Sequence, residues 1–301
     1  IGSNDGTLLS NFHGAHKTLG VEPTGAHKHA LAKGIPTVNE FFTRELAGRL
    51  AREHGKARLV TAANVFAHIE DVHGVIEGIL ELLAQDGVFI NESHYLPSLL
   101  ETLQYDTVYH EHLRYYSLTS LKALLAHHGL EPVHAVRIPT HGGSIRTYAA
   151  RKGTRPVRPS VAAVLKEEER VLAPAAFAEF RRKVSLSKMA LHALLWGLKK
   201  DGKRVYAIGA PSRAATLVNY VGLDETVLDC VLEVPGSSKL GKYLPGTRIP
   251  VVDEKRLFED PPDAALLLSW HIADELMPKL RAKGFKGAFV VPLPEPRLLP
   301  G

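Results

Sequence analysis

The feature that most constrains the fold is a regular alternation of strand-like and helix-like stretches in the first half of the chain. Short apolar segments that favour strands cover residues 17–22, 59–64 and 87–92. Between the last two, residues 72–83 carry apolar side chains three and four positions apart, which is the helical period. A helix over 120–128 and closing strands over 133–139 and 144–150 complete the pattern. Such alternation predicts βαβ units and a mostly parallel, doubly wound sheet.

The second half predicts another α/β arrangement. A run rich in proline and arginine at 153–159 marks a boundary, and residues 160–172 and 175–200 then predict helices interrupted at Pro174. Beyond them the expected strands are 204–208, 227–231, 264–269 and 287–291, with helices from about Arg213 and from Ala273. We therefore expect an α/β protein with a first Rossmann-like domain over 1–152, a helical linker over 153–200 and a second, smaller Rossmann-like domain over 201–301.

Composition excludes several classes of function. With 301 residues and 45% hydrophobic residues, the chain can bury a core without a disulfide or metal staple. The single cysteine, Cys230, fits a reducing cytoplasm and cannot build a cysteine-rich zinc site. No apolar run reaches the ~20 residues of a membrane helix. A scattered net charge of +5 argues against nucleic acid. We expect a cytoplasmic protein with no membrane or nucleic-acid partner and no metal; its oligomeric state stays open, a monomer included.

The chain begins with a glycine-bearing loop that runs into a helix, IGSNDGTLL. Glycines let a backbone approach a ligand, and a helix start offers unpaired N–H groups. The Gly-x-x-x-Gly spacing differs from the Gly-x-Gly-x-x-Gly of dinucleotide sites. Glu22 ends the next strand, where an acid accepts the hydroxyls of a ribose. The pattern favours a nucleoside ligand over an incidental surface turn. The loop residues expected to hold it are Gly2, Ser3, Asn4, Asp5 and Gly6.

Histidines gather in three places. Asn64 and His68 follow the strand at 59–64, and ligands of open α/β sheets bind at the carboxyl ends of strands. Both side chains are therefore expected to face the pocket, although a lone histidine is often structural. His141 and Gly142 lie in a polar loop, THGGS, whose glycines admit a substrate close to the backbone. A plain turn is the alternative there.

The run Tyr109-His110-Glu111-His112 is the most unusual of the three, because four polar side chains in a row are costly to bury without a purpose. Three interpretations stay open. In the first, His110 and His112 bind a metal, but no carboxylate or cysteine at matching spacing completes a site. In the second, the run is an exposed polar loop. In the third, one imidazole acts as a general base that Glu111 orients.

The second half carries a weaker candidate site. The turn GAPSR follows an expected strand and opens a helix, which suits a phosphate with Arg213 as its charge partner. Lys239 and Tyr243 lie in a loop rich in proline and glycine that would close over a nucleotide. The alternatives are an ordinary strand-to-helix turn and solvated lysines.

Taken together, these motifs resemble the sugar C-methyltransferases of deoxysugar pathways. The resemblance covers nearly the whole chain, and the YHEH run with its flanks is its most specific part. The segments that carry it are IGSNDGTLL, GVEPT, ANVFAHIEDV, YDTVYHEHLRYYSL, PTHGGSIR, GAPSRAATLVNYVGL, KLGKYLPGTRIPV and LLSWHIADEL.

The resemblance implies S-adenosylmethionine (SAM) in the first domain, held by the Gly2–Gly6 loop, Glu22 and Asn64. It implies a nucleotide-linked 4-ketosugar in the cleft between domains as substrate. By the same resemblance His112 removes the proton beside the ketone, and the residues that line its site are Tyr109, Glu111 and His68. Such chemistry needs a base near neutral pKa, donors for an oxyanion and alignment of the methyl group, and no metal.

The chain departs from the family pattern in three ways. Relatives carry a preceding domain with a four-cysteine zinc site, so we expect zinc only in that domain, which this sequence lacks. Ile1 stands where the first strand of the family's sheet should be ending, and loss of a central strand is expected to destabilise the sheet. Ser212-Arg213-Ala214-Ala215 replaces the more usual Ala-Lys-Gly-Asn but keeps a basic residue.

Rival functions remain at this stage. Methylation of oxygen or nitrogen on a similar molecule would need a base but no ketone. A non-catalytic nucleotide-binding fragment is a rival of another class. A dehydrogenase is disfavoured, because both halves lack Gly-x-Gly-x-x-Gly.

Overall fold

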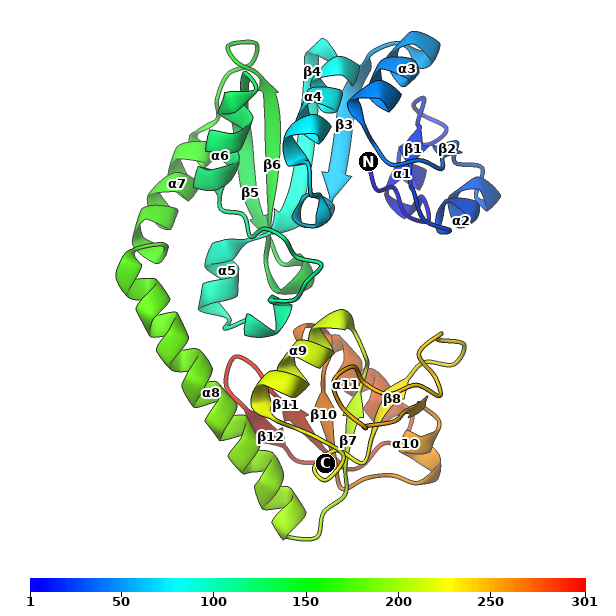
Figure 1. Cartoon of the computed structure of the whole chain (residues 1–301), viewed down its shortest axis with the longest axis vertical. Helices are drawn as coiled ribbons and strands as arrows, with labels where there is room; N and C mark the ends of the chain where they lie inside the picture. Colours follow the sequence, from blue (N-terminus) through cyan, green and yellow to red (C-terminus); the bar gives the residue numbers. More distant parts are fainter. The chain divides into compact units, whose positions relative to one another are not determined.

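The computed structural model describes all 301 residues, and they form two compact units of mixed α/β structure (Figure 1). Unit 1 comprises Ile1–Ser98 and Glu111–Leu172, and unit 2 comprises Leu99–His110 and Ala173–Gly301. The α/β fold class is confirmed. The expected linker helices belong to the units themselves, and the excursion Leu99–His110 joins unit 2 although no sequence pattern indicates it.

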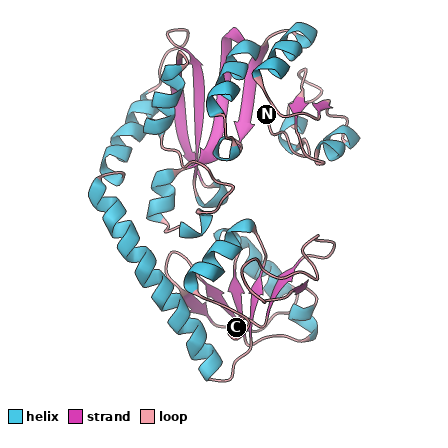
Figure 2. Cartoon of the chain, viewed as in Figure 1, coloured by secondary structure: helices cyan, strands magenta, loops and turns pink.

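Unit 1 holds two sheets (Figure 2). The smaller pairs β1 (Gly20–Val21) with β2 (Thr37–Val38) in parallel. The larger has the order β3-β4-β6-β5, with bounds Ala57–Ala63 for β3, Leu83–His94 for β4, Ser144–Arg151 for β6 and Leu130–Ile138 for β5. Only β3 and β4 are parallel there, so the expectation of a mostly parallel sheet is wrong for this half. The cause is a short connection between β5 and β6, with positive φ at Gly142 and Gly143, which makes a hairpin.

The helices of unit 1 begin where their sequences offer caps. The side chain of Thr43 accepts a hydrogen bond at the start of α3, Asp71 does so for α4, and Ser117 for α6. Helix α4 packs against α3 and β4, while α6 and α7 pack against β5 (Figure 1). The bounds are α1 (Thr7–Ser10), α2 (His27–Ala32), α3 (Arg44–His54), α4 (Val72–Leu82), α5 (Leu96–Glu101, shared by the two units), α6 (Leu118–His127) and α7 (Pro159–Val171).

The first residues of the chain lie between the two sheets of unit 1. The amino group of Ile1 donates to the carbonyl oxygen of Thr61 in β3 at 2.8 Å. Two residues on, Ser3 N–H donates to the carbonyl oxygen of Val21 in β1 at 3.1 Å. The opening loop is thereby held beside the carboxyl ends of β1 and β3, which is where Glu22 and Asn64 lie.

Unit 2 is built on one sheet in the order β12-β11-β10-β7-β8-β9, parallel except for β12. Counted from β7, this is the 3-2-1-4-5-6 order of a Rossmann fold, so the predicted second domain of this type is confirmed in its topology. The bounds are α8 (Pro174–Lys200), β7 (Val205–Ile208), α9 (Ser212–Val221), β8 (Cys230–Glu233), β9 (Val251–Asp253), α10 (Arg256–Glu259), β10 (Ala264–Leu267), α11 (Ala273–Ala282), β11 (Ala288–Val291) and β12 (Arg297–Leu299).

Two expectations for unit 2 need correction. The strand expected at 227–231 begins only at Cys230, because the buried residues Val227 and Leu228 belong to a turn that hydrogen-bonds back to Asp224. These two residues are apolar because the turn buries them in the core, and not because they belong to a strand. Strands β9 and β12 were not predicted, since three residues carry too little pattern to recognise.

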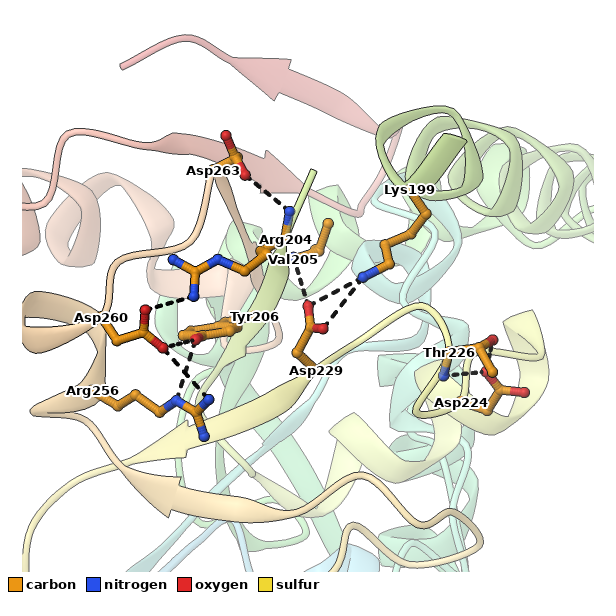
Figure 3. A network of polar contacts seen from close by, with 10 residues as sticks. All are labelled: Lys199, Arg204, Val205, Tyr206, Asp224, Thr226, Asp229, Arg256, Asp260 and Asp263. Carbon is orange, nitrogen blue, oxygen red and sulfur yellow. Dashed lines mark hydrogen bonds and ion pairs between the residues drawn. The ribbon is translucent and has the colours of Figure 1, made fainter. Parts of the chain in front are cut away.

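A network of ion pairs closes the amino-terminal edge of this sheet (Figure 3). Asp229 accepts hydrogen bonds from the backbone of Val205 and from Lys199, and Asp260 accepts from Tyr206. Asp263 accepts from the backbone of Arg204 at 2.9 Å. Beside it lies a surface hollow of about 580 Å³ that contains none of the predicted site residues. The network is at the edge opposite to the one where parallel sheets bind ligands, so we assign it a structural role.

No helix in the chain combines the length and the apolar composition that a bilayer crossing requires.

Candidate active site

Glu22 is the organising residue of the opening loop. Its side chain is 6% exposed, and one carboxylate oxygen accepts from Asn4 N–H at 3.0 Å while the other accepts from Thr24 N–H at 2.9 Å. Burial raises the pKa of Glu22, but the hydrogen bonds from Thr24 and Asn4 outweigh it, so that the pKa falls below its ordinary value. The carboxylate is therefore charged, and each oxygen keeps a lone pair for a further donor.

The loop itself is shaped by left-handed backbone at three positions. Gly2, Asn4 and Gly6 have φ of +61°, +51° and +78°. A methyl group at Gly2 would lie 2.5 Å from Cγ2 of Val65, so only glycine fits there. This close approach places the loop directly against the residue that follows Asn64.

Asp5 lies on the exposed side of the loop. Its carboxylate pairs with Lys33 Nζ at 2.7 Å and accepts from the hydroxyl of Thr7 at 2.9 Å. The hydrogen bond from Lys33, with those from Thr7, holds the pKa of Asp5 well below its usual range. The structure thus brings the predicted loop residues, Glu22 and Asn64 to one edge of unit 1, with Asp5 turned outward to a lysine.

Asn64 marks the end of β3. It has φ of +56°, a conformation that asparagine tolerates better than most residues, and its N–H donates to the carbonyl oxygen of Glu92 in β4 at 2.8 Å. The chain then turns into a short 3₁₀ helix, η1 (Phe66–His68). This turn carries His68 to the carboxyl edge of the sheet, as the sequence predicts.

The segment that contains His112 docks on η1. Leu113 N–H donates to the carbonyl oxygen of Ala67 at 2.8 Å, and Nδ1 of His68 lies 2.9 Å from the carbonyl oxygen of Glu111. A carbonyl only accepts, so Nδ1 of His68 carries the proton and Nε2 is left as an acceptor in the neutral ring. The interaction of Glu111 with an imidazole therefore uses its backbone oxygen; the expected orienting contact from its carboxylate is not present, and that side chain is exposed.

His112 sits in a cluster of aromatic rings. Its ring centroid lies 5.0 Å from that of His68, 5.3 Å from that of His94 and 6.2 Å from that of Tyr115. His141, from the loop at the β5–β6 turn, lies 6.0 Å from His94. Four imidazoles thus meet in unit 1 beyond the carboxyl ends of β3 and β4.

His94 is the member of this cluster that the sequence interpretation missed. It is the last residue of β4, so the rule that pointed to Asn64 at the end of β3 would have found it. The run of apolar and polar residues before it, GVFINES, was assigned a strand end two residues too early.

The loop with His141 and Gly142 is fixed by another residue near the end of β4. Glu92 accepts two hydrogen bonds from Arg146, at 2.8 and 3.0 Å, and one from the hydroxyl of Thr140 at 3.2 Å. His141 itself has φ of +55°, which is strained for a residue with a side chain. Neither Glu92 nor Arg146 was predicted as a site residue.

Tyr109 and His110 belong to unit 2, at the end of the excursion Leu99–His110. Their rings lie 6.4 Å apart. The 3₁₀ turn η2 (Tyr105–Thr107) precedes them and packs against α9. Of the YHEH run, therefore, Glu111 and His112 are placed with the imidazole cluster of unit 1, and the run straddles the division between units.

Arg213 forms an ion pair inside unit 2. It is 7% exposed, and its guanidinium donates to both oxygens of Asp106, at 2.7 and 2.8 Å. Trp270 Nε1 donates to the same carboxylate at 2.7 Å. The structure therefore assigns this side of the guanidinium to an internal ion pair. The predicted contact of Arg213 with a substrate phosphate stays a prediction.

Lys239 and Tyr243 lie elsewhere in unit 2. Nζ of Lys239 donates to the carbonyl oxygen of Ala210 at 2.5 Å, beside Glu233 Oε2 at 3.9 Å, so this lysine does reach the turn after β7. Tyr243 is 64% exposed and forms an isolated bridge with Pro250. His141 and Gly142, predicted to bind the same substrate, are in unit 1.

Comparison with known proteins identifies the family. Residues 139–294 match the family model of the C-methyltransferase C-terminal domain, and residues 1–135 match that of a methyltransferase domain. The C-methyltransferase NovU of Streptomyces niveus is 38% identical over 316 residues, which cover 99% of this chain and 72% of NovU.

Similar solved structures include a SAM-dependent methyltransferase from Anabaena variabilis, with 16% identity, coverage of 50% of this chain and 75% of that one, and a TM-score of 0.39. The PH0226 protein of Pyrococcus horikoshii has 15% identity, coverage of 50% and 79%, and a TM-score of 0.38. The identity with NovU and the two family models decide the assignment. The chain belongs to the family of SAM-dependent C-methyltransferases.

Proposed function

We propose that this methyltransferase methylates a carbon atom next to the ketone of a nucleotide-linked 4-ketosugar, with His112 as the base. The observation that carries the proposal is the position of His112, packed among His68, His94 and Tyr115 at the edge of unit 1 where Glu22 and the glycine loop also lie. The sugar nucleotide is inferred from the likeness of the YHEH run to sugar C-methyltransferases and from the similarity to NovU, itself named a C-methyltransferase.

The residues of the opening loop fit SAM. Glu22 is charged, and its two remaining lone pairs suit the two hydroxyls of a ribose. Glycine at positions 2 and 6 lets the loop adopt positive φ and pack tightly, since a side chain would meet Val65 at Gly2 and Ala30 at Gly6. Bound SAM supplies an electrophilic methyl group on a sulfonium centre. In this proposal Glu22 binds the ribose, and Asn64 lies beside it at the end of β3.

In this proposal His112 accepts the proton that leaves the carbon beside the ketone. A carbon beside a ketone is a weak acid, so it needs a base whose ordinary pKa is close to neutral, and imidazole is that side chain. After accepting the proton, an imidazolium donates from both of its nitrogens. His68 provides an acceptor within the cluster. Its Nδ1–H donates to the carbonyl oxygen of Glu111, so Nε2 of the neutral ring carries no proton.

The oxygen of the ketone acquires negative charge as the proton leaves. Donors already in place stabilise such charge, since they need no reorganisation during the reaction. The expected ones, from the resemblance, are Tyr109 and the loop at His141 and Gly142. Glu92 accepts a hydrogen bond from Thr140 in that loop.

The test uses SAM with a carbon-13 methyl group and a set of thymidine- and uridine-diphosphate 4-keto-6-deoxysugars. The proposal predicts a product whose new methyl carbon shows one-bond coupling to a sugar carbon in the NMR spectrum. A methyl group attached to oxygen or nitrogen would contradict it. So would calorimetric binding of S-adenosylhomocysteine without methylation of any sugar in the set.

A further inference from the structure

A second group of imidazoles lies in unit 1, outside the active site. It is formed by His73 in the first turn of α4, His127 in the last residue of α6 and His128 directly after it. Their ligand nitrogens all lie within 4.8 Å of one another. We propose that this group, the tri-histidine cluster, is a binding site for a zinc ion or a chemically similar divalent transition metal.

The local structure explains how two neighbouring histidines face the same point. Successive residues of a helix point about 100° apart. Here α6 ends at His127, and His128 has φ of −104° and ψ of 15°, outside the helical conformation. Gly129 follows with φ of +70°, as at many helix ends. The break brings the rings of His127 and His128 to 5.1 Å between centroids.

The third ring completes a triangle. The centroid of His73 lies 5.4 Å from that of His127 and 5.1 Å from that of His128, and its Nδ1 is 2.8 Å from Nε2 of His128. Tetrahedral zinc with Zn–N bonds of about 2.0–2.1 Å needs nitrogens about 3.3 Å apart. Small rotations of these side chains reach that spacing. Two of the three residues are exposed, so their rings turn without disturbing the core.

The donor set selects the class of metal. Imidazole nitrogen suits zinc, copper and nickel, whereas magnesium and calcium need several oxygens, which the cluster does not offer. Three nitrogens leave a fourth position for water. Ligation requires neutral rings, so the affinity for the metal falls as pH is lowered.

A bound ion would tie the start of α4 to the end of α6. The start of α4 directly follows the segment held by Arg114, whose guanidinium donates to the carbonyl oxygens of Ile69 and Glu70. His68 precedes that segment. The proposed metal therefore stabilises the start of α4, which follows the segment that contains His68, and takes no part in the chemistry.

The test is titration of the chelator-stripped full chain with Zn²⁺ by calorimetry. The informative variant is His127→Gln, whose side chain is exposed, and the matched control is His29→Gln on the surface of α2. A third variant, His112→Gln, separates this site from the imidazoles of the active site. We expect one zinc equivalent that persists in His29→Gln and His112→Gln and weakens at least about tenfold in His127→Gln, since one of three ligands is lost.

X-ray absorption at the zinc edge provides a second measurement, with three imidazole nitrogens expected around the ion. Zinc should also raise the midpoint of thermal unfolding of the wild type and of His29→Gln but not of His127→Gln. The proposal is overturned if the wild type binds no zinc, if His127→Gln keeps the same affinity, or if the equivalent disappears in His112→Gln instead.

Discussion

The carboxylate of Asp106, 0% exposed, accepts hydrogen bonds from Nε and from one terminal nitrogen of the Arg213 guanidinium, at 2.7 and 2.8 Å, within unit 2. Arg213 is in the first turn of α9, after β7, and Trp270, which donates to the same carboxylate, follows β10. β7 and β10 are the strands at which the order of a Rossmann sheet reverses, where such folds bind ligands. In unit 2 this position is filled by the chain's own excursion Leu99–His110.

We predict that Asp106→Asn destabilises unit 2 strongly, because it leaves a buried guanidinium without its counter-charge. The expected loss is about 3–5 kcal/mol in the free energy of unfolding. Both tryptophans, Trp196 and Trp270, are in unit 2, so urea unfolding followed by tryptophan fluorescence reports on it selectively. The control, Asp274→Asn on the exposed face of α11, should change little. Equal effects of the two variants would refute the role given to Asp106.

Glu168 is a second buried carboxylate, in unit 1, and its hydrogen-bond donors are backbone N–H groups. It is 1% exposed and accepts from the backbone N–H of Leu118 and Thr119, at 2.5 and 2.8 Å, at the start of α6. Glu168→Gln should cost about 1–3 kcal/mol, because a charged acceptor is replaced by a neutral amide. Hydrogen exchange of the Leu118 amide should accelerate. Glu169→Gln, one residue on and exposed, is the control, and unchanged Leu118 exchange in Glu168→Gln would rule the cap out.

The thiol of Cys230 should not react with thiol reagents in the folded protein. Burial raises the pKa of its thiol to about 12, so thiolate is scarce at pH 8. A disulfide reagent such as dithionitrobenzoate should react with no thiol of the native chain and with one thiol in denaturant. Because the pKa is higher in the folded than in the unfolded state, the stability from this group is full below pH ~9 and declines as pH rises toward 12. Rapid reaction of the native protein would contradict this.

Glu22→Gln should weaken binding of S-adenosylhomocysteine at least about tenfold, since the variant loses the charged acceptor proposed for the ribose hydroxyls. The amide also donates where Glu22 now only accepts, so the loop at Asn4 should loosen. Calorimetry measures the affinity, with Glu45→Gln on the exposed side of α3 as control. Because the pKa of Glu22 is depressed, its contribution to the free energy of unfolding is present above the ordinary carboxylate pKa of ~4.3 and is lost as pH falls below it. Wild-type affinity in Glu22→Gln would exclude the ribose contact.

The alternation of elements in the sequence predicted the two α/β units, because the period of apolar residues is a local property. It failed for β5 and β6, whose antiparallel direction depends on the hairpin at Gly142 and Gly143. Strands of two or three residues, such as β2 and β9, escaped because their pairing is set by distant partners. Residue type alone also did not reveal the ion pair of Arg213, since its partner Asp106 lies far away in the chain.

The candidate site was predictable where strand ends mark it. Asn64 and His68 follow β3, and the structure places them against Glu92 and Glu111. His94 was missed because the end of its strand was placed two residues too early. The tri-histidine cluster was missed because its members come from two helices and converge only in the fold. The contact between His68 and the carbonyl oxygen of Glu111 depends on one backbone conformation that no spacing encodes.

In the proposed mechanism His112 takes a proton from carbon. The most direct measurement is hydrogen–deuterium exchange at the carbon beside the ketone, followed by NMR on a thymidine-diphosphate 4-keto-6-deoxysugar in D₂O with S-adenosylhomocysteine present. We predict exchange in the wild type and in His110→Gln, and at least about 100-fold slower exchange in His112→Gln. Exchange at the wild-type rate in His112→Gln would contradict it.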